Sequence, residues 1–113
     1  MHEASLAGGV LQLVEAAAQR EGFSRVMTLR IEAGRLAGVD VRALRFALES
    51  LAPGTPLEGA RLAFEEPPGQ AWCLPCGRTV AHGQRGDACP HCGGYQLQPT
   101  GGMELRVVDM TVL

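Results

Sequence analysis

The sequence contains no lysine, and all ten of its basic residues are arginines. The α-amino group of Met1 is therefore the only primary amine in the chain. Twelve acidic residues bring the formal net charge to −2, whereas a general nucleic-acid binder has a basic patch or a clearly basic balance. The arginines are spread singly from Arg20 to Arg106. The composition thus argues against nucleic acid as a partner.

Long apolar runs are absent as well. No run approaches the roughly 20 residues that a membrane helix needs, and the N-terminus lacks the features of a secretory signal. We therefore expect a cytoplasmic protein that does not contact a membrane. The sequence also has no nucleophile–base pair, no phosphate-binding glycine loop and no clustered carboxylates, so we predict that it is not an enzyme.

Two segments show the periodicity of amphipathic helices. Apolar residues recur at spacings of three and four between positions 6 and 18, and again between positions 41 and 51. Gly22 is expected to end the first helix. Asp40 lies at the N-cap position of the second helix, where its side chain would accept a backbone hydrogen bond.

Three segments show the alternation of half-buried strands: residues 25–33, 60–66 and 104–113. The last changes phase near Val107 and Val108, as expected for a β-bulge or for burial of both faces. With the helices, these strands predict an α+β fold in which two helices pack on a three-stranded sheet.

A segment of different composition separates the second and third strands. It opens with "EEPPG", closes with "QPTGG", and contains all four cysteines and the only tryptophan. Proline and glycine at both edges indicate an inserted module rather than a long loop. We predict a discontinuous α/β domain, residues 1–66 and 101–113, interrupted by a zinc-ribbon-like module at 67–100.

The cysteines form two pairs, "CLPC" (Cys73, Cys76) and "CPHC" (Cys89, Cys92), each followed by glycine. Four thiolates at this spacing fit a closed tetrahedral zinc site, and glycine permits the tight turn of a metal knuckle. Disulfides are disfavoured without an oxidising compartment, and a thioredoxin-like motif needs only one pair at a strand-to-helix turn. We therefore predict a structural Zn²⁺.

The metal is expected to supply most of the folding energy of this module. Residues 69–97 are too few to build a hydrophobic core. We expect Trp72 and Tyr95 to cover the metal site, and His82 and His91 to be surface residues.

The first three residues, "MHE", have two interpretations. Glu3 in the first turn of a helix complements the helix dipole, with His2 as an exposed terminal residue. Alternatively, the Met1 amine, the His2 amide and imidazole, and the Glu3 amide provide four nitrogen donors to a square-planar divalent metal such as nickel. Protons would compete for the amine near neutral pH. The tripeptide alone leaves both interpretations open.

Several segments together resemble the HypA/HybF family of hydrogenase-maturation nickel metallochaperones. They are "MHEASL", "RIEAGRLAGVD" leading into "ALRFALE", "LEGARLAFEE", the two cysteine pairs and "GGMELRVVDMTV". The match is collinear from Met1 to the last strand. The resemblance implies Ni²⁺ as cargo, bound through Met1, His2 and Glu3 with the carboxylate of Asp40 approaching, and Zn²⁺ as a structural ion.

The resemblance also implies a role in delivery. The family passes nickel to the large subunit of nickel-iron hydrogenase in partnership with the GTPase HypB, and some relatives serve urease. The hinge-like borders of the module are compatible with a domain-swapped homodimer. The alternative is a zinc-ribbon module that contacts nucleic acid or a protein complex, against which the net charge and the presence of only Arg78 and Arg85 in the ribbon count.

Overall fold

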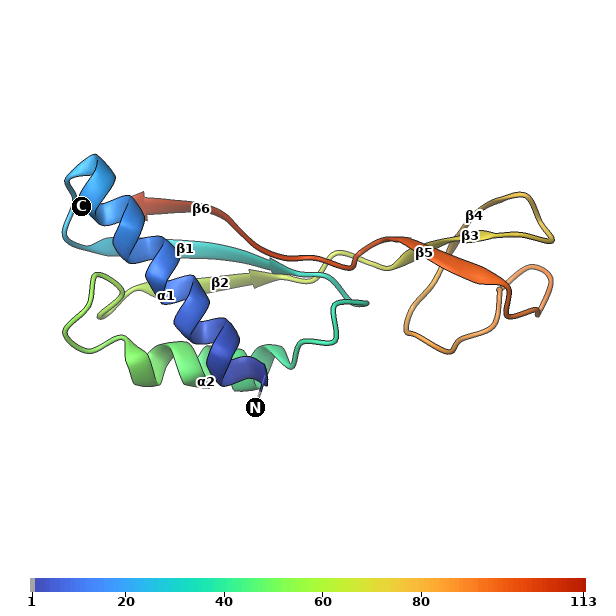
Figure 1. Ribbon diagram of the computed structural model, residues 1–113, viewed down its shortest axis with the longest axis horizontal. Helices are drawn as coiled ribbons and strands as arrows, with labels where there is room; N and C mark the ends of the chain where they lie inside the picture. Colours follow the sequence, from blue (N-terminus) through green and yellow to red (C-terminus); the bar gives the residue numbers. More distant parts are fainter. Residues whose placement is uncertain (1) are drawn as a thin grey trace. The chain divides into compact units, whose positions relative to one another are not determined.

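The computed structural model describes residues 2–113 (Figure 1), so the prediction for Met1 lies outside the described residues. The elements, in chain order, are α1 (His2–Glu21), β1 (Val26–Ala33), α2 (Val41–Leu51), β2 (Arg61–Glu65), β3 (Gln70–Cys73), β4 (Arg78–Ala81), β5 (Leu97–Gly101) and β6 (Leu105–Val112). The strands form two three-stranded sheets, ordered β2-β1-β6 and β4-β3-β5. Among residues 2–113, no helix combines the length and the apolar character that crossing a membrane requires.

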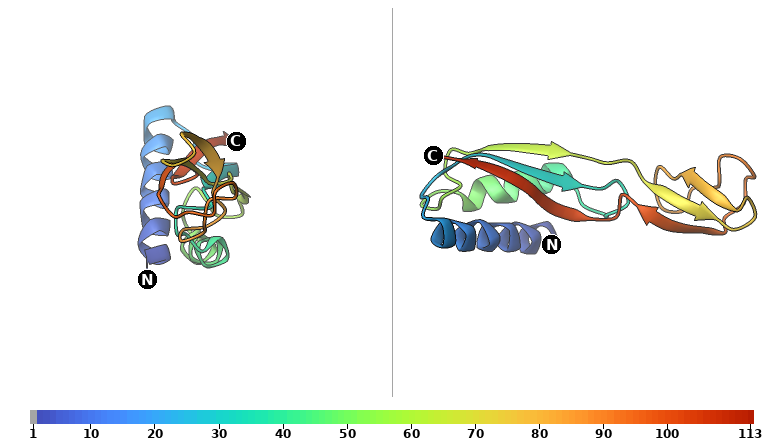
Figure 2. Two further views of the ribbon diagram at one scale, coloured as in Figure 1. Left: turned by 90° about the vertical axis from the view of Figure 1, so that its right-hand side faces the viewer. Right: turned by 90° about the horizontal axis from the view of Figure 1, so that it is seen from above.

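Helix α1 begins at His2, several residues before the first apolar position that its periodicity marks. Its buried face consists of small and β-branched residues: Ala7, Val10, Val14, Ala17 and Ala18. Small side chains allow α1 to pack closely on α2, and both helices lie on the same face of the β2-β1-β6 sheet (Figure 2). The helix ends as expected at Gly22, whose φ of 78° is left-handed and whose N–H donates to the Ala18 carbonyl at 2.8 Å.

Helix α2 begins at the predicted N-cap. The Asp40 backbone is extended, and its Oδ1 accepts a hydrogen bond from the Ala43 N–H at 3.1 Å. This bond satisfies one of the amide groups that have no partner within the first turn. Leu44 and Leu48, one turn apart on α2, are buried.

The β2-β1-β6 sheet buries one face of β1, with Leu29 and Ile31 fully inaccessible. On its other face, Arg30 donates to both carboxylate oxygens of Asp109 at 2.8 Å, and Arg106 donates to Glu32 at 2.8 Å. The two β1 residues are two positions apart, whereas their β6 partners are three apart. This pairing fits a bulge at the predicted phase change in β6.

Strand β3 of the β4-β3-β5 sheet ends at Cys73, and the other three cysteines lie outside the strands. Strand β3 pairs antiparallel with both neighbours, and Cys73 lies opposite Arg78 on β4 and Leu97 on β5. Ala71 and Cys73 are fully buried, whereas the intervening Trp72 points to the other face because successive side chains alternate.

The chain divides into two compact units. The helical unit comprises Met1–Ile31, Val39–Phe64 and Val107–Leu113, and the cysteine unit comprises Glu32–Gly38 and Glu65–Arg106. Residues 32–38, the end of β1 and the loop after it, thus group with the cysteines, although they lie within the predicted α/β domain (1–66 and 101–113) rather than the predicted module (67–100). That functional division remains a prediction.

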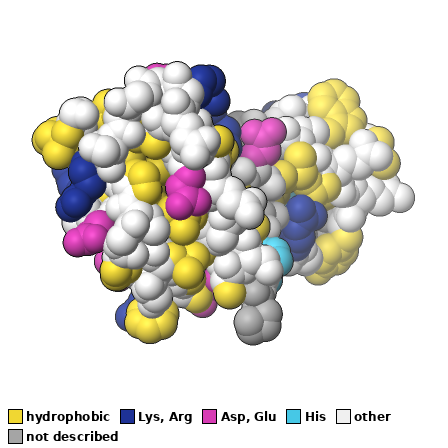
Figure 3. Space-filling view, turned by 60° about the vertical axis from the view of Figure 1, so that its left-hand side comes forward, with side chains coloured by type: hydrophobic (Ala, Val, Ile, Leu, Met, Phe, Trp, Pro, Cys, Tyr) yellow, Lys and Arg dark blue, Asp and Glu magenta, His cyan; other side chains and the backbone are white. Residues whose placement is uncertain are grey.

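Hydrophobic side chains are also exposed among charged ones on the surface (Figure 3). In the helical unit they include Phe46, 72% exposed, and Leu51, 42% exposed. These two side chains line a groove of about 440 Å³ in the helical unit, together with Glu3, Ala4, Ala43, Ala47 and Ser50.

Candidate metal centres

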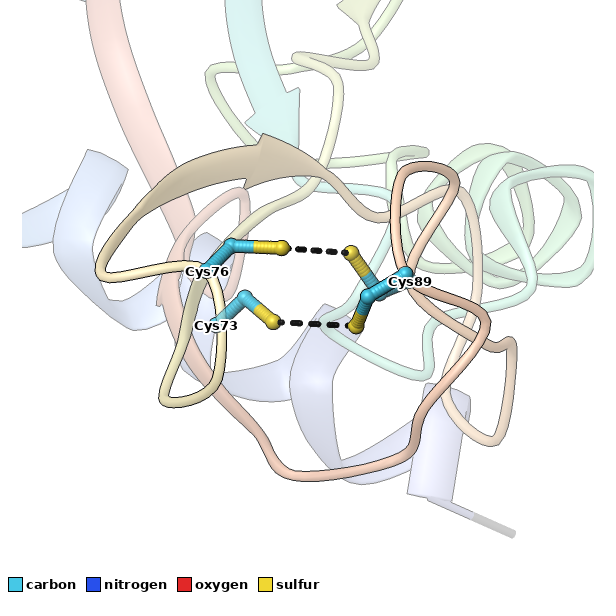
Figure 4. A group of neighbouring side chains, drawn as sticks. Cys73, Cys76 and Cys89 are labelled. Atoms are coloured by element: carbon cyan, nitrogen blue, oxygen red, sulfur yellow. Dashed lines mark hydrogen bonds between the residues drawn. The ribbon is translucent and has the colours of Figure 1, made fainter.

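The four cysteine side chains converge on one point of the cysteine unit, and Figure 4 labels three of them, Cys73, Cys76 and Cys89. All four Sγ atoms lie within 4.8 Å of one another, with Cys73 and Cys92 separated by 3.7 Å and Cys76 and Cys89 by 3.9 Å. A tetrahedral zinc ion with Zn–S bonds of about 2.3 Å requires S–S separations of about 3.8 Å. A disulfide would need about 2.05 Å. The geometry therefore fits a four-thiolate metal site.

Each cysteine pair is shaped by a glycine turn. Gly77 and Gly93 have φ angles of 64° and 74°, and their N–H groups donate to the carbonyls of Cys73 and Cys89 at 2.8 and 2.9 Å. Two backbone N–H groups also donate to cysteine sulfurs, each at 3.4 Å. They are His91 N–H to Cys89 Sγ and Gly94 N–H to Cys92 Sγ. Such bonds favour the thiolate form that binds metal.

The thiols strongly influence one another's protonation. A backbone hydrogen bond at Cys92 is the main cause that lowers the pKa of Cys89 to about 6. Hydrogen bonding to Cys73, followed by burial, raises the pKa of Cys76 to about 12. Four sulfurs this close cannot all ionise without a compensating cation. A divalent metal would supply that charge and displace the remaining protons.

The apolar contacts around the sulfurs are few. Cys73 and Cys89 are buried against Val80 and the partly buried Leu97. Trp72 and Tyr95, expected to cover the site, are 39% and 73% exposed. That expectation is wrong because strand alternation turns Trp72 away from Cys73 and because Tyr95 extends into solvent.

The histidines of the cysteine unit differ from each other. His91 is exposed, as predicted. His82, predicted to be a surface residue, is only 5% exposed. Its N–H donates to the Gly69 carbonyl at 3.0 Å, so the backbone after β4 is drawn against the start of β3. Gly69 carries no side chain, and this close approach buries His82.

At the other candidate centre, residues from the starts of both helices meet. The Glu3 carboxylate accepts a hydrogen bond from the Asp40 N–H at 3.0 Å, across 37 positions of sequence. The same Glu3 oxygen, Oε2, lies 3.7 Å from the His2 Nδ1, whose side chain is 61% exposed. The Asp40 N–H is the main cause that holds the pKa of the Glu3 carboxyl below its usual value. The structure thus gathers His2, Glu3 and Asp40.

The position of His2 and Glu3 in the first turn of α1 also matters for their backbone. The first four N–H groups of a helix have no acceptor within it. A metal can therefore replace the amide protons of His2 and Glu3 without breaking a hydrogen bond of α1. The Glu3 carboxylate, by contrast, is already engaged by the backbone N–H groups of Asp40 and of Glu3 itself.

The comparisons with known proteins cover nearly the whole chain. The profile of the HypA family, described as "Hydrogenase/urease nickel incorporation, metallochaperone", matches residues 1–112. A hydrogenase maturation factor HypA from Polaromonas naphthalenivorans is 69% identical over 112 residues, covering 99% of this chain and 97% of the relative. Another from Cupriavidus necator is 66% identical, with 99% and 94% covered.

Solved structures agree on the fold. The solution structure of the Ni metallochaperone HypA from Helicobacter pylori superposes with a TM-score of 0.68 at 18% identity, covering 98% of this chain and 97% of that one. A second solution structure of a HypA protein gives a TM-score of 0.70 at 19% identity, covering 100% and 97%. The family profile and the sequence relatives confirm the resemblance: the chain belongs to the HypA family of nickel-incorporation metallochaperones for hydrogenase maturation.

Proposed function

We propose that this protein binds Ni(II) at its N-terminus and delivers it to the large subunit of nickel-iron hydrogenase. The observation that carries this proposal is the Glu3–Asp40 hydrogen bond beside the exposed His2 imidazole. The bond joins Glu3 and Asp40, two of the residues that the family resemblance assigns to nickel. Delivery takes place in the cytoplasm with a HypB-type GTPase, and urease is the client where an organism uses the protein for that enzyme.

The nickel donors in this proposal are the Met1 amine, the His2 amide and imidazole, and the Glu3 amide. Four nitrogens suit a square-planar divalent ion. Asp40 supports the site: its Oδ1 is engaged by the Ala43 N–H, which leaves Oδ2 available to approach the metal. Binding displaces protons from the amine and both amides, so a fall in pH or a proton donor on the acceptor favours release.

The four cysteines, Cys73, Cys76, Cys89 and Cys92, hold a structural Zn²⁺ in this proposal. When all four ligand positions are thiolates, no position remains for water or substrate. The zinc therefore stabilises the cysteine unit rather than performing chemistry, in keeping with a carrier that is not an enzyme. Within this unit, residues 67–100 are proposed as the inserted module, which serves as a docking surface for partners.

The groove lined by Phe46 and Leu51 supports delivery from the N-terminus. Glu3 forms part of its lining, so a protein bound there lies next to the proposed nickel ligands. An exposed phenylalanine in an apolar groove is a favourable contact for a partner. Nickel could then pass to the partner without crossing bulk solvent.

The test is a calorimetric nickel titration of the zinc-loaded protein with a native terminus and with one glycine added before Met1. The extension moves the primary amine away from His2 and leaves every side chain unchanged. We expect the tight one-to-one site to be lost. A matched control is His91→Ala, which removes another exposed imidazole and should bind nickel as the native protein does. Equal binding by the extended and native proteins would refute the N-terminal site.

A further inference from the structure

The cysteine unit contains a second candidate site, a pocket of about 240 Å³. Its lining combines charged, polar and apolar side chains, which include His82, Arg85, Asp87, Tyr95, Leu97 and Pro99. None of the four cysteines is among the lining residues. The pocket is therefore distinct from the thiolate site both in its residues and in its chemistry.

A buried imidazole forms part of the pocket lining. His82 is 5% exposed, and its Nδ1 has no hydrogen-bond partner among residues 2–113. Buried polar atoms are nearly always hydrogen-bonded, and one without a partner destabilises the fold. In a neutral imidazole, one ring nitrogen accepts a hydrogen bond. A ligand that brings a hydrogen-bond donor into the pocket would therefore compensate for the burial of this ring.

A tight turn carries the two charged side chains of the pocket. The Asp87 N–H donates to the Gln84 carbonyl at 3.2 Å, which closes the turn. Gly86 precedes Asp87 and has a φ of 92°. A type II turn requires a positive φ at this position, and glycine adopts it without strain. The turn therefore fixes the backbone from which the Arg85 and Asp87 side chains extend.

The Arg85 guanidinium is held by the backbone of the cysteine unit. Its Nε–H donates to the Leu36 carbonyl at 3.1 Å, and the Leu36 N–H donates to the Gly102 carbonyl at 2.7 Å. All three residues belong to the cysteine unit. With Nε engaged, the terminal nitrogens of Arg85 remain available to bind a carboxylate through two parallel hydrogen bonds.

The opposite charges of Arg85 and Asp87 are not paired with each other. Within the part of the chain that the structure describes, neither side chain forms an ion pair with any other residue. A ligand that carries both a carboxylate and an ammonium group can pair both of these charges at once. Leu97 and Pro99 provide apolar contacts for the rest of such a ligand.

We propose that this pocket binds a free α-amino acid, which carries a carboxylate and an ammonium group on the same carbon. The carboxylate contacts the Arg85 guanidinium. The ammonium group donates hydrogen bonds to the Asp87 carboxylate and to the His82 imidazole, and the amino-acid side chain lies against Leu97 and Pro99. This site goes beyond the proposed nickel function and shares no residue with the nickel ligands.

An NMR titration of the full chain, loaded with zinc and free of nickel, tests the proposal. The probe is L-alanine, and two analogues each lack one of its charges. N-acetyl-L-alanine has no ammonium group and resembles the C-terminus of a peptide, whereas L-alaninamide has no carboxylate and resembles an N-terminus. Backbone amide resonances report where each compound binds, and the imidazole ¹⁵N resonances of His82 report contact with the ring.

We expect L-alanine to shift the amide resonances of Gly86, Asp87 and Leu97, with a dissociation constant on the order of 1 mM. The ring resonances of His82 should shift, whereas those of the exposed His91 should not. Each analogue should bind at least about tenfold more weakly, because it leaves one charge of the pocket unpaired. Absence of saturable shifts at these amides would refute the site. Binding of either analogue as tight as that of L-alanine would replace the amino acid with the end of a peptide and overturn the proposal.

Matched variants test the two charged residues. Asp87→Asn and Arg85→Met should each weaken L-alanine binding at least about tenfold, because each removes one charge-assisted contact. Glu66→Gln and Arg78→Met remove exposed charges of the same unit outside the pocket and should bind L-alanine as the native protein does. Every variant is first checked for full zinc content. Native affinity in either pocket variant, or an equal loss in the two controls, would overturn the proposal.

Discussion

Asp40 takes part in two local interactions at once. Its side chain caps α2 through Ala43, while its backbone N–H donates to Glu3 at the start of α1. The sequence predicts the capping role from position alone, because a short acceptor immediately before an apolar helical period is a typical N-cap. The contact with Glu3 depends on tertiary packing and was not predicted: the family resemblance implied only that the Asp40 carboxylate approaches the nickel site.

Replacing Asp40 separates these two interactions. Asp40→Ala removes the cap and should lower the free energy of unfolding by about 1 kcal/mol, whereas Asp40→Asn keeps a capping oxygen and should cost much less. Urea denaturation followed by circular dichroism measures both. Since neither substitution removes the backbone N–H, the Glu3 contact should persist. If Asp40→Ala and Asp40→Asn lower the free energy of unfolding equally, the negative charge of Asp40, rather than its capping hydrogen bond, stabilises the fold.

His82 shows where inference from single residues fails. A lone histidine in a polar, glycine-rich segment is expected at the surface, yet it is buried. Its burial follows from the backbone bond to Gly69, thirteen residues earlier. No local pattern encodes that pairing, because it requires β3 and β4 to be already paired.

Among the secondary-structure elements, the long and periodic ones were predictable and the short ones were not. Helices α1 and α2 and strands β1, β2 and β6 follow apolar periods that the sequence displays. Strands β3, β4 and β5 have four or five residues each, and β5 contains Pro99, which usually argues against a strand. Their pairing is imposed by the cysteine turns. The 34–38 loop was also missed, since its partners are distant in sequence.

The ion pair between β1 and β6 gives a pH-dependent prediction for these strands. A hydrogen bond from Arg30 holds the pKa of Asp109 below its usual value of 3.8. A lowered folded pKa means that the pair stabilises the native state above pH 3.8 and that this contribution is lost as pH falls through the lowered value. In a carboxyl ¹³C NMR titration, Arg30→Met should shift the Asp109 midpoint upward toward 3.8. An unchanged midpoint would show that Arg30 does not interact with Asp109 in solution.

In the whole molecule, the two units are stabilised by different forces. The helical unit buries a continuous set of apolar side chains from both helices and β1, including Val14, Leu29, Leu44 and Leu48. The cysteine unit has a much smaller core, in which two of the buried side chains are cysteines. Structural zinc contributes about 10–16 kcal/mol in comparable small domains. A metal bound by the four cysteines would therefore be the main source of stability for the cysteine unit and not for the helical unit.

Metal removal should accordingly unfold one unit and spare the other. A strong chelator at neutral pH should abolish hydrogen-exchange protection of Val80 and Leu36, while the ellipticity at 222 nm persists because both helices belong to the helical unit. The Leu36 amide is decisive, since its bond to Gly102 belongs to the cysteine unit although residue 36 lies in the predicted α/β domain. If Leu36 stays protected while Val80 exchanges freely, residues 32–38 fold independently of the metal and do not belong to the cysteine unit.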